Sequence, residues 1–134
     1  FHQDNYYWNI KDKKAVNLWV AIDKVNSKNG GLIYLKESHK KGLIKHSLSN
    51  TMGTSQEIKK EYLLKLKYKK KIPTLNPGDC IIHHCEVIHG SSPNLTKKNR
   101  TGVVISLKAK SSKIDNKKNK IYLLKLKKIL KKSA

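Results

Sequence analysis

The segment AVNLWVAID, residues Ala15–Asp23, alternates in side-chain character and predicts a β-strand. Its even-numbered positions, from Val16 to Ile22, are all aliphatic, whereas the odd-numbered positions include Asn17 and Trp19. Successive side chains of a strand point to opposite faces, so one face of this strand is continuously apolar. A second layer of structure must cover that face to remove it from water.

Further strands are predicted beside turn sequences that follow this segment. NSKNGG at 26–31 has Asn-Gly turn chemistry and leads into a strand at 32–35. After the turn TLNPGD at 74–79, CIIHHCEVIH at 80–89 is predicted as one strand and TGVVISLKA at 101–109 as the last. Short strands with little helix between them indicate an antiparallel β-sandwich or barrel, so the predicted fold class is mainly β.

The remaining segments are less regular. Residues 36–56 are polar and predict a long loop of the kind that often forms a lid, whereas 57–68 fits either a helix or an edge strand. Residues 110–120 predict a disordered linker, followed by a basic amphipathic helix. The chain of 134 residues is therefore divided into a β domain at 1–110 and a Lys-rich tail at 111–134. The apolar positions of the tail helix are Tyr122, Leu126, Ile129 and Leu130.

The composition is strongly basic, with a formal net charge of +21. A basic β-sandwich module that binds nucleic acid through its lysines is therefore one alternative function. However, 29 of the 30 basic residues are lysines, and nucleic-acid sites favour the bidentate guanidinium of arginine. The lysines are also scattered along the chain, so nucleic-acid binding is not the favoured interpretation.

The hydropathy and the cysteine content indicate in which cellular compartment the protein is expected. No apolar stretch approaches the ~18 residues that a membrane-spanning helix needs. The two cysteines, Cys80 and Cys85, do not form a disulfide framework, and a reducing, cytoplasmic compartment is predicted. Together with His89 they lack the paired spacing of a structural zinc site.

Histidine and carboxylate side chains occur at two places that a β fold can bring together. His2 and Asp4 are separated by one residue, so on a strand they project from the same face. His89 ends an apolar run, and Arg100, the single arginine, follows it at the start of the next predicted strand. Two imidazoles and one carboxylate on one face of an octahedral ion suit non-haem Fe(II) that acts with O₂. A guanidinium can hold a carboxylate through two parallel hydrogen bonds.

Four segments carry a family resemblance. They are HQDNYYW at 2–8, WVAID to NGGL at 19–32, SHKKG at 38–42 and PGDCIIHHCEVIHGSSPNLTKKNR at 77–100. In these segments the chain resembles the phytanoyl-CoA dioxygenase family, whose members are Fe(II)- and 2-oxoglutarate-dependent oxygenases on a double-stranded β-helix, a jelly-roll or cupin-like barrel. The resemblance implies that His2, Asp4 and His89 bind iron. Because related halogenases replace the carboxylate ligand, the presence of Asp4 implies hydroxylation of a small organic substrate, with release of succinate and CO₂.

The resemblance also implies a cosubstrate site. Arg100 is expected to hold the distal carboxylate of 2-oxoglutarate, Ser91 to assist it, and Trp19 to line the pocket. The family's barrel begins before the first ligand motif, so the chain is expected to be a fragment, incomplete at its N-terminus. Its apolar strand face at 16–22 would then lack a cover, and the fragment alone is expected to aggregate and to be inactive. The substrate stays open among an acyl-CoA, a free metabolite and an amino acid derivative.

Other histidines and aromatic residues have more than one interpretation. His83 and His84 are adjacent and face opposite ways on a strand, so either is a hydrogen-bonded core residue or supports a ligand or substrate. His39 and His46 lie in a polar segment and are expected at the surface, with a lid role as the alternative. The aromatic run at 6–8 either lines the pocket or packs in the barrel.

Overall fold

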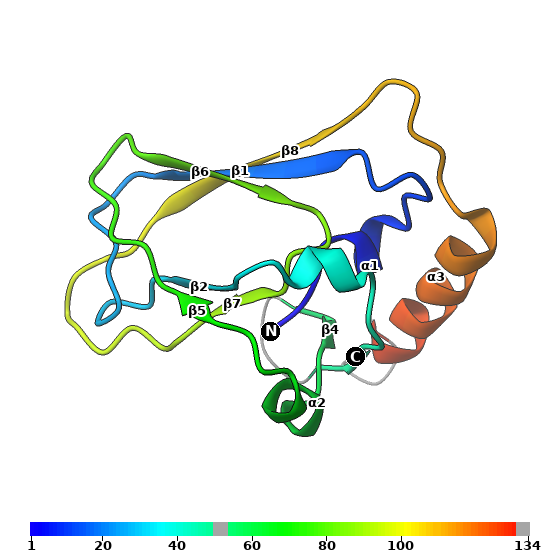
Figure 1. Ribbon diagram of the computed structural model, residues 1–134, viewed down its shortest axis with the longest axis horizontal. Coiled ribbons are helices and arrows are strands. Elements are labelled where there is room, and N and C mark those ends of the chain that lie inside the picture. Colours follow the sequence, from blue (N-terminus) through cyan, green and yellow to red (C-terminus); the bar gives the residue numbers. More distant parts are fainter. Residues whose placement is uncertain (50–53, 131–134) are drawn as a thin grey trace.

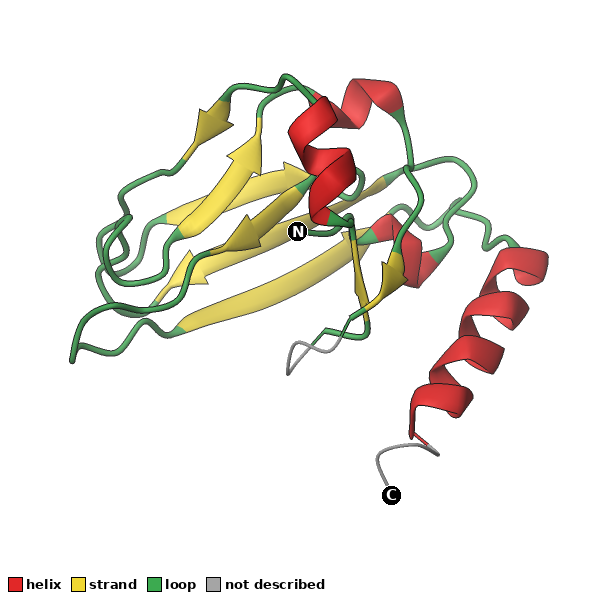
Figure 2. Cartoon of the chain, turned by 90° about the horizontal axis from the view of Figure 1, so that it is seen from below, coloured by secondary structure: helices red, strands yellow, loops and turns green. Residues whose placement is uncertain are grey.

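The computed structural model describes residues 1–49 and 54–130. Figures 1 and 2 show two small β-sheets that face each other, with the helices at one end and below. The elements in chain order are α1 (Asn5–Trp8), β1 (Ala15–Ala21), β2 (Leu32–Leu35), the 3-10 helix η1 (Ser38–Lys41), β3 (Ser47–Leu48), β4 (Gln56–Glu57), α2 (Lys60–Lys65), β5 (Lys70–Lys71), β6 (Cys80–His84), β7 (His89–Ser91), β8 (Gly102–Lys108) and α3 (Asn116–Leu130).

The two main sheets are antiparallel and have the strand orders β6-β1-β8 and β5-β2-β7. In the first sheet the central β1 pairs along its length with both neighbours, so that Leu18 faces Ile82 on β6 and Ile105 on β8. The mainly β class is therefore confirmed. Within the described residues the sheets form an open sandwich and no closed barrel, because each main sheet has three strands and its outer strands leave free edges.

The single strand predicted over 80–89 is wrong. Strand β6 ends at His84, and a turn closed by the hydrogen bond from the Val87 amide to the His84 carbonyl (3.0 Å) separates it from β7. The chain crosses here from one sheet to the other, which places His89 in the sheet opposite β6. The apolar run continues through the turn, so the hydropathy pattern could not mark the break.

The irregular segments contain more structure than their sequence predicted. The expected loop at 36–56 holds η1, β3 and β4, and the ambiguous segment at 57–68 contains the short helix α2. The expected linker is partly ordered, since Ile114 pairs with Ile10 and α3 begins at Asn116. Long-range backbone pairing stabilises these pieces, and a local pattern does not encode it.

Helix α3 lies against the end of the sandwich near α1 (Figures 1 and 2). The Asp115 amide donates to the Asn9 carbonyl at 2.7 Å, and the Tyr122 ring meets the Tyr7 ring edge-on at 5.8 Å between centroids. The side chains of Ile129 and Leu130, and residues 131–134, lie outside the described residues. Among the helices that the structure describes, none has the length and apolar content to cross a bilayer. The cytoplasmic location stays a prediction.

The inner face of β1 carries the odd-numbered residues. Trp19 is buried there and packs with Ala21, Val25 and Leu75 between the sheets. Gly102 on β8 is required beside it, because a β-carbon at this position would overlap the Trp19 ring. Asn17 is buried on the same face, so the interior of the sandwich is partly polar at this point.

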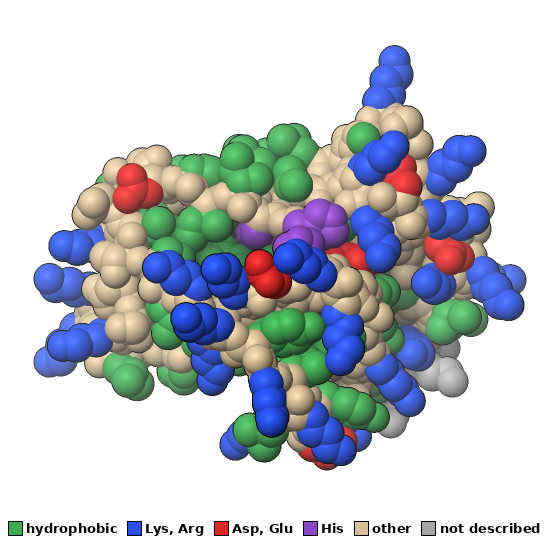
Figure 3. Space-filling view, in the orientation of Figure 1, with side chains coloured by type: hydrophobic (Ala, Val, Ile, Leu, Met, Phe, Trp, Pro, Cys, Tyr) green, Lys and Arg blue, Asp and Glu red, His purple; other side chains and the backbone are tan. Residues whose placement is uncertain are grey.

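The outer face of the same sheet is apolar and exposed. Its β1 residues, from Val16 to Val20, are only half-buried, and the large side chains of the flanking strands are exposed. Figure 3 shows apolar side chains gathered along this side of the molecule, above β6, β1 and β8. Among the described residues this face is half-buried or exposed, which agrees with the expectation that it lacks a cover. The exposed residues of the flanking strands are Ile82 (65%), Val103 (47%), Ile105 (45%) and Leu107 (50%).

An apolar face of this kind favours self-association. We expect the double substitution Ile82→Lys and Ile105→Lys to reduce oligomers and aggregates of the chain, measured by size-exclusion chromatography with light scattering. Leu64→Lys is the matched control, because Leu64 is even more exposed (74%) but lies on α2, away from the sheet. Equal self-association of the double variant and the wild type would contradict this prediction.

Candidate metal centre

The backbone of His2 pairs directly with that of His89. The His2 amide donates to the His89 carbonyl at 2.9 Å, and the His89 amide donates to the His2 carbonyl at 3.0 Å. This isolated antiparallel pair joins the N-terminal segment to β7 and brings the two imidazole centroids to 4.4 Å. Residues 87 positions apart in the sequence are thus immediate neighbours.

Asp4 was predicted to lie on a strand, but it does not, because the chain turns into helix α1 directly after it. The Gln3 side chain, between the two ligand candidates in the sequence, is fully buried and hydrogen-bonded to backbone groups. Its amide nitrogen donates to the carbonyls of Gly42 and Glu86, and its amide oxygen accepts from Ile44. His2 and Asp4 nevertheless reach the same space, from a bridge and a helical turn rather than from one strand face.

Three side chains converge at this point. Asp4 Oδ1 lies 3.4 Å from His2 Nε2 and 3.7 Å from His89 Nε2. One ligand-type atom from each of the three residues lies within 4.8 Å of the others. Cys80 is exposed and Cys85 is buried elsewhere, and neither belongs to this cluster.

The electrostatics of the cluster suit a cation. Burial opposes ionisation of Asp4, but hydrogen bonds from His2 and His83, together with the electrostatic coupling to His89 and His2, outweigh it and hold its pKa below the usual range. Burial lowers the pKa of His89 to about 4, so its imidazole is neutral at neutral pH. The Nδ1 atom of His89 lies 3.1 Å from the Val87 carbonyl, to which it donates, and this leaves the Nε2 lone pair toward the cluster.

A cavity of about 450 Å³ opens onto the cluster. Trp19 and Ser91, both named from the sequence, line it. The Arg100 guanidinium lies over the Trp19 ring, 5.9 Å from its centroid, as in a cation–π pair. None of the ion pairs found among the described residues involves Arg100. The structure thus places Arg100 beside the Trp19 ring and not in contact with the three clustered side chains.

Several cavity residues were missed by the sequence analysis. Thr54, Gln56 and Glu57 line the cavity from β4 and the residues before it. The first two lie in the segment predicted as loop, and Glu57 begins the segment predicted as either a helix or an edge strand. The side chain of Gln56 is fully buried, and neither its amide nitrogen nor its amide oxygen has a hydrogen-bond partner in the described part of the chain. No motif marks these residues, because they reach the cavity through the β3–β4 pairing.

The other histidines differ in burial. The adjacent His83 and His84 face opposite ways, as predicted, whereas the prediction for His46 is wrong. His83 is buried and hydrogen-bonded at both nitrogens, whereas its neighbour His84 is half-buried. His46 was expected at the surface but is only 3% exposed, because its Nε2 accepts the Gln3 amide at 3.0 Å. His39 is half-buried.

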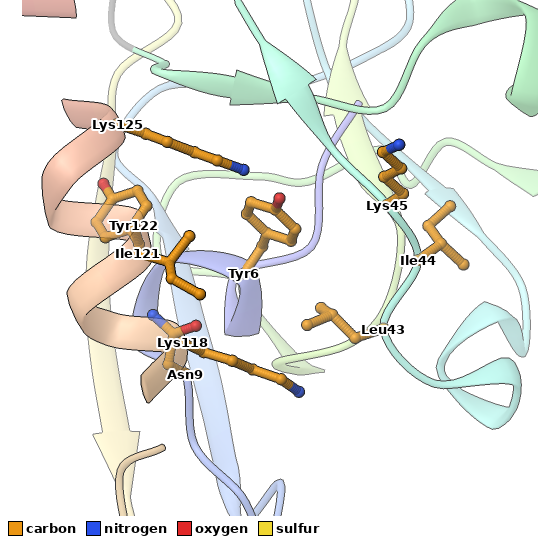
Figure 4. A pocket seen from close by; sticks show the side chains of 9 residues that line it. All are labelled: Tyr6, Asn9, Leu43, Ile44, Lys45, Lys118, Ile121, Tyr122 and Lys125. Atoms are coloured by element: carbon orange, nitrogen blue, oxygen red, sulfur yellow. The ribbon is translucent and has the colours of Figure 1, made fainter. Parts of the chain in front are cut away.

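The aromatic run at 6–8 packs within the fold, and none of its residues is among those that line the cavity at the cluster. The Tyr7 ring packs edge-on against His2, at 5.7 Å between centroids, and Trp8 packs against a small apolar cluster. Tyr6 lies in a second cavity of about 300 Å³ under α3, where Lys118 and Lys125 extend toward it and the opposite loop (Figure 4). Among the described residues, neither a histidine nor a carboxylate lines this second cavity, so its chemistry differs from that of the candidate metal centre.

Comparison with known proteins identifies the same family that the sequence segments resemble. Residues 1–102 match the family model described as phytanoyl-CoA dioxygenase (PhyH). A probable phytanoyl-CoA dioxygenase of Caenorhabditis elegans is 28% identical over 107 residues, which cover 76% of this chain and 33% of that protein. The chain therefore spans about a third of the length of this curated relative.

Solved structures share the fold. The non-heme monooxygenase ThoJ superposes with a TM-score of 0.65 and 24% identity, over 84% of this chain and 40% of that one. The epimerase SnoN, solved in complex with Fe³⁺, α-ketoglutarate and nogalamycin RO, superposes with a TM-score of 0.61 and 19% identity, over 83% of this chain and 42% of that one.

The burial of His46 makes the stability of the chain dependent on pH. Burial lowers the pKa of His46 from 6.5 to about 4, so on acidification the unfolded chain binds a proton before the folded chain does. The free energy of unfolding is therefore expected to fall as pH drops below 6.5, by about 2 kcal/mol at pH 5. Urea unfolding at several pH values measures this.

We expect His46→Gln to reduce that pH dependence, with His39→Gln as the matched control from the neighbouring 3-10 helix. His89 contributes a loss of the same sign, so part of the dependence persists in the variant. An unchanged pH profile in His46→Gln would contradict the assignment.

Proposed function

This chain belongs to the phytanoyl-CoA dioxygenase family, and on that premise we propose that it carries the iron centre of an Fe(II)- and 2-oxoglutarate-dependent dioxygenase. The proposed iron ligands are His2, Asp4 and His89. The observation that carries the proposal is the convergence of their three ligand-type atoms within 4.8 Å. Because the chain covers a third of its curated relative, the activity is proposed for the protein that contains it.

The residues present fit ferrous iron. Two imidazoles and an ionised carboxylate form the donor set that non-haem Fe(II) oxygenases use, and they leave coordination positions open. When bound, Fe(II) and 2-oxoglutarate would supply O₂ activation, which hydroxylates the substrate and releases succinate and CO₂. The chain contributes the backbone pair of His2 and His89, which keeps the two residues adjacent, and a cavity that opens onto the three side chains.

The proposed cosubstrate site uses Arg100, Ser91 and Trp19. Ser91 and Trp19 line the cavity, and the Arg100 guanidinium lies over the Trp19 ring at cation–π distance. A guanidinium can bind the distal carboxylate of 2-oxoglutarate through two parallel hydrogen bonds. We propose that Trp19, for whose ring Gly102 leaves room, orients Arg100 for this contact.

The proposed substrate is a small organic molecule. The cavity of about 450 Å³ lies within the range of small-molecule sites. Its lining combines apolar side chains, such as Phe1 and Leu32, with the polar Gln56 and Thr54. A substrate with both apolar and polar parts fits such a lining.

The metal ligands are tested by binding of Fe(II) under anaerobic conditions. We expect His2→Ala and Asp4→Ala to weaken Fe(II) binding at least about tenfold and to abolish the visible charge-transfer band that forms on addition of 2-oxoglutarate. His39→Ala is the matched control outside the cluster. Wild-type binding by Asp4→Ala would refute the ligand assignment.

The cosubstrate contact is tested separately. We expect Arg100→Lys to weaken 2-oxoglutarate binding about tenfold, because an ammonium group cannot reproduce the two parallel hydrogen bonds. Fe(II) affinity without 2-oxoglutarate should not change. Lys98→Arg, a reciprocal exchange at an exposed neighbour, serves as the control in the same titration. Unchanged 2-oxoglutarate affinity in Arg100→Lys would rule out the proposed contact.

A further inference from the structure

The two oxygens of the Asp4 carboxylate have different surroundings. Oδ1 faces the imidazoles of His2 and His89. Oδ2 points to the opposite side, where it accepts from Asn17 Nδ2 at 2.8 Å and lies 3.2 Å from His83 Nε2. Only one of the two oxygens is therefore directed to the candidate metal position.

The residues around Oδ2 form one row across the first sheet. Asn17 on β1 is the cross-strand partner of His83 on β6 and of Ser106 on β8. The Ser106 hydroxyl donates to Asn17 Oδ1, so the Asn17 side chain is held at one end while its Nδ2 donates to Asp4. We refer to His83, Asn17 and Ser106 as the polar row.

The hydrogen bonds determine the tautomer of His83. An ionised carboxylate only accepts, so His83 Nε2 carries the proton that it donates to Asp4. The Nδ1 atom then accepts from the Tyr34 hydroxyl at 3.2 Å. Burial raises the pKa of Tyr34, so this hydroxyl keeps its proton and donates. A chain of donors therefore runs from Tyr34 through His83 to Asp4.

We propose that the polar row, with Tyr34 behind it, orients Asp4 so that it binds iron through Oδ1 alone. His83 and Asn17 are then positioning residues for a ligand. The inference rests on the proposed role of Asp4 as an iron ligand. A carboxylate held in this way occupies one coordination position, which leaves one more for the cosubstrate and O₂ than a bidentate carboxylate would.

The arrangement is more specific than the burial of a polar core requires. His83 is 8% exposed and Asn17 is 5% exposed, so both must find hydrogen-bond partners inside the sandwich. Each could be satisfied by the backbone or by the other, but both donate to the same oxygen of the same carboxylate. Partners of this kind around metal ligands commonly contribute tenfold to a hundredfold to metal affinity.

The test uses Co(II) as the probe and the full chain. We expect His83→Phe, which keeps a ring but removes the donor, to weaken Co(II) binding about tenfold to a hundredfold. His83→Gln, which keeps an N–H donor, should restore most of that affinity. His84→Phe is the matched control, because the neighbouring ring faces the other way and does not contact Asp4.

Infrared spectra of the Co(II) complex provide a readout that a purely structural role would not change. In the wild type the separation of the two carboxylate stretching bands should be that of a monodentate ligand, and it should narrow in His83→Phe, because Oδ2 then keeps only the donor of Asn17 and can approach the metal. Tyr34→Phe, which removes the donor to Nδ1, is a milder variant with the same expected direction. It decides the matter if His83→Phe does not fold.

This inference would be overturned if the folded His83 and Tyr34 variants had the Co(II) affinity and the carboxylate bands of the wild type. The proposed iron centre would then still stand. A wild-type chain that binds Co(II) no better than His2→Ala would overturn the proposed function itself. The two failures are therefore distinguishable.

Discussion

The reciprocal backbone hydrogen bonds between His2 and His89 are the interaction on which the candidate site depends. They join the N-terminal segment to β7 and set the separation of the two imidazoles. Because the backbone forms these bonds, the two residues are held next to each other without any contribution from their side chains. Everything else at the site, including the turn at Gln3 and the entry of Asp4, is arranged around this pair.

A cluster of imidazoles and a carboxylate inside a β-sandwich is costly unless its polar atoms have partners. The structure supplies those partners from both sheets: the Val87 carbonyl for His89, and the polar row with Tyr34 for Asp4. The same sheet that carries the polar row on its inner face is apolar on its outer face. The strand β1 therefore serves the site with one face and leaves the other available for burial.

Local patterns predicted much of this arrangement, and failed where the pairing is long-range. The alternation at Ala15–Asp23 correctly predicted β1, and the turn chemistry correctly preceded β2. The continuous apolar run at 80–89 hid the turn that carries the chain between sheets, because a hydropathy pattern has no signal for a change of sheet. His46 looked like a surface residue because its partner, the Gln3 amide, is a backbone group 43 positions away.

The sequence by itself determined the strand periodicity, the residue types of a His/Asp/His cluster and the single guanidinium, since these depend only on side-chain chemistry and spacing. The tertiary structure decided that Asp4 enters from a helical turn, that Arg100 lies over Trp19, and that Gln56 reaches the cavity without a motif. It also decided which oxygen of Asp4 faces the imidazoles. These features depend on contacts between distant segments, such as cross-strand register, which is a property of paired segments that neither segment specifies alone.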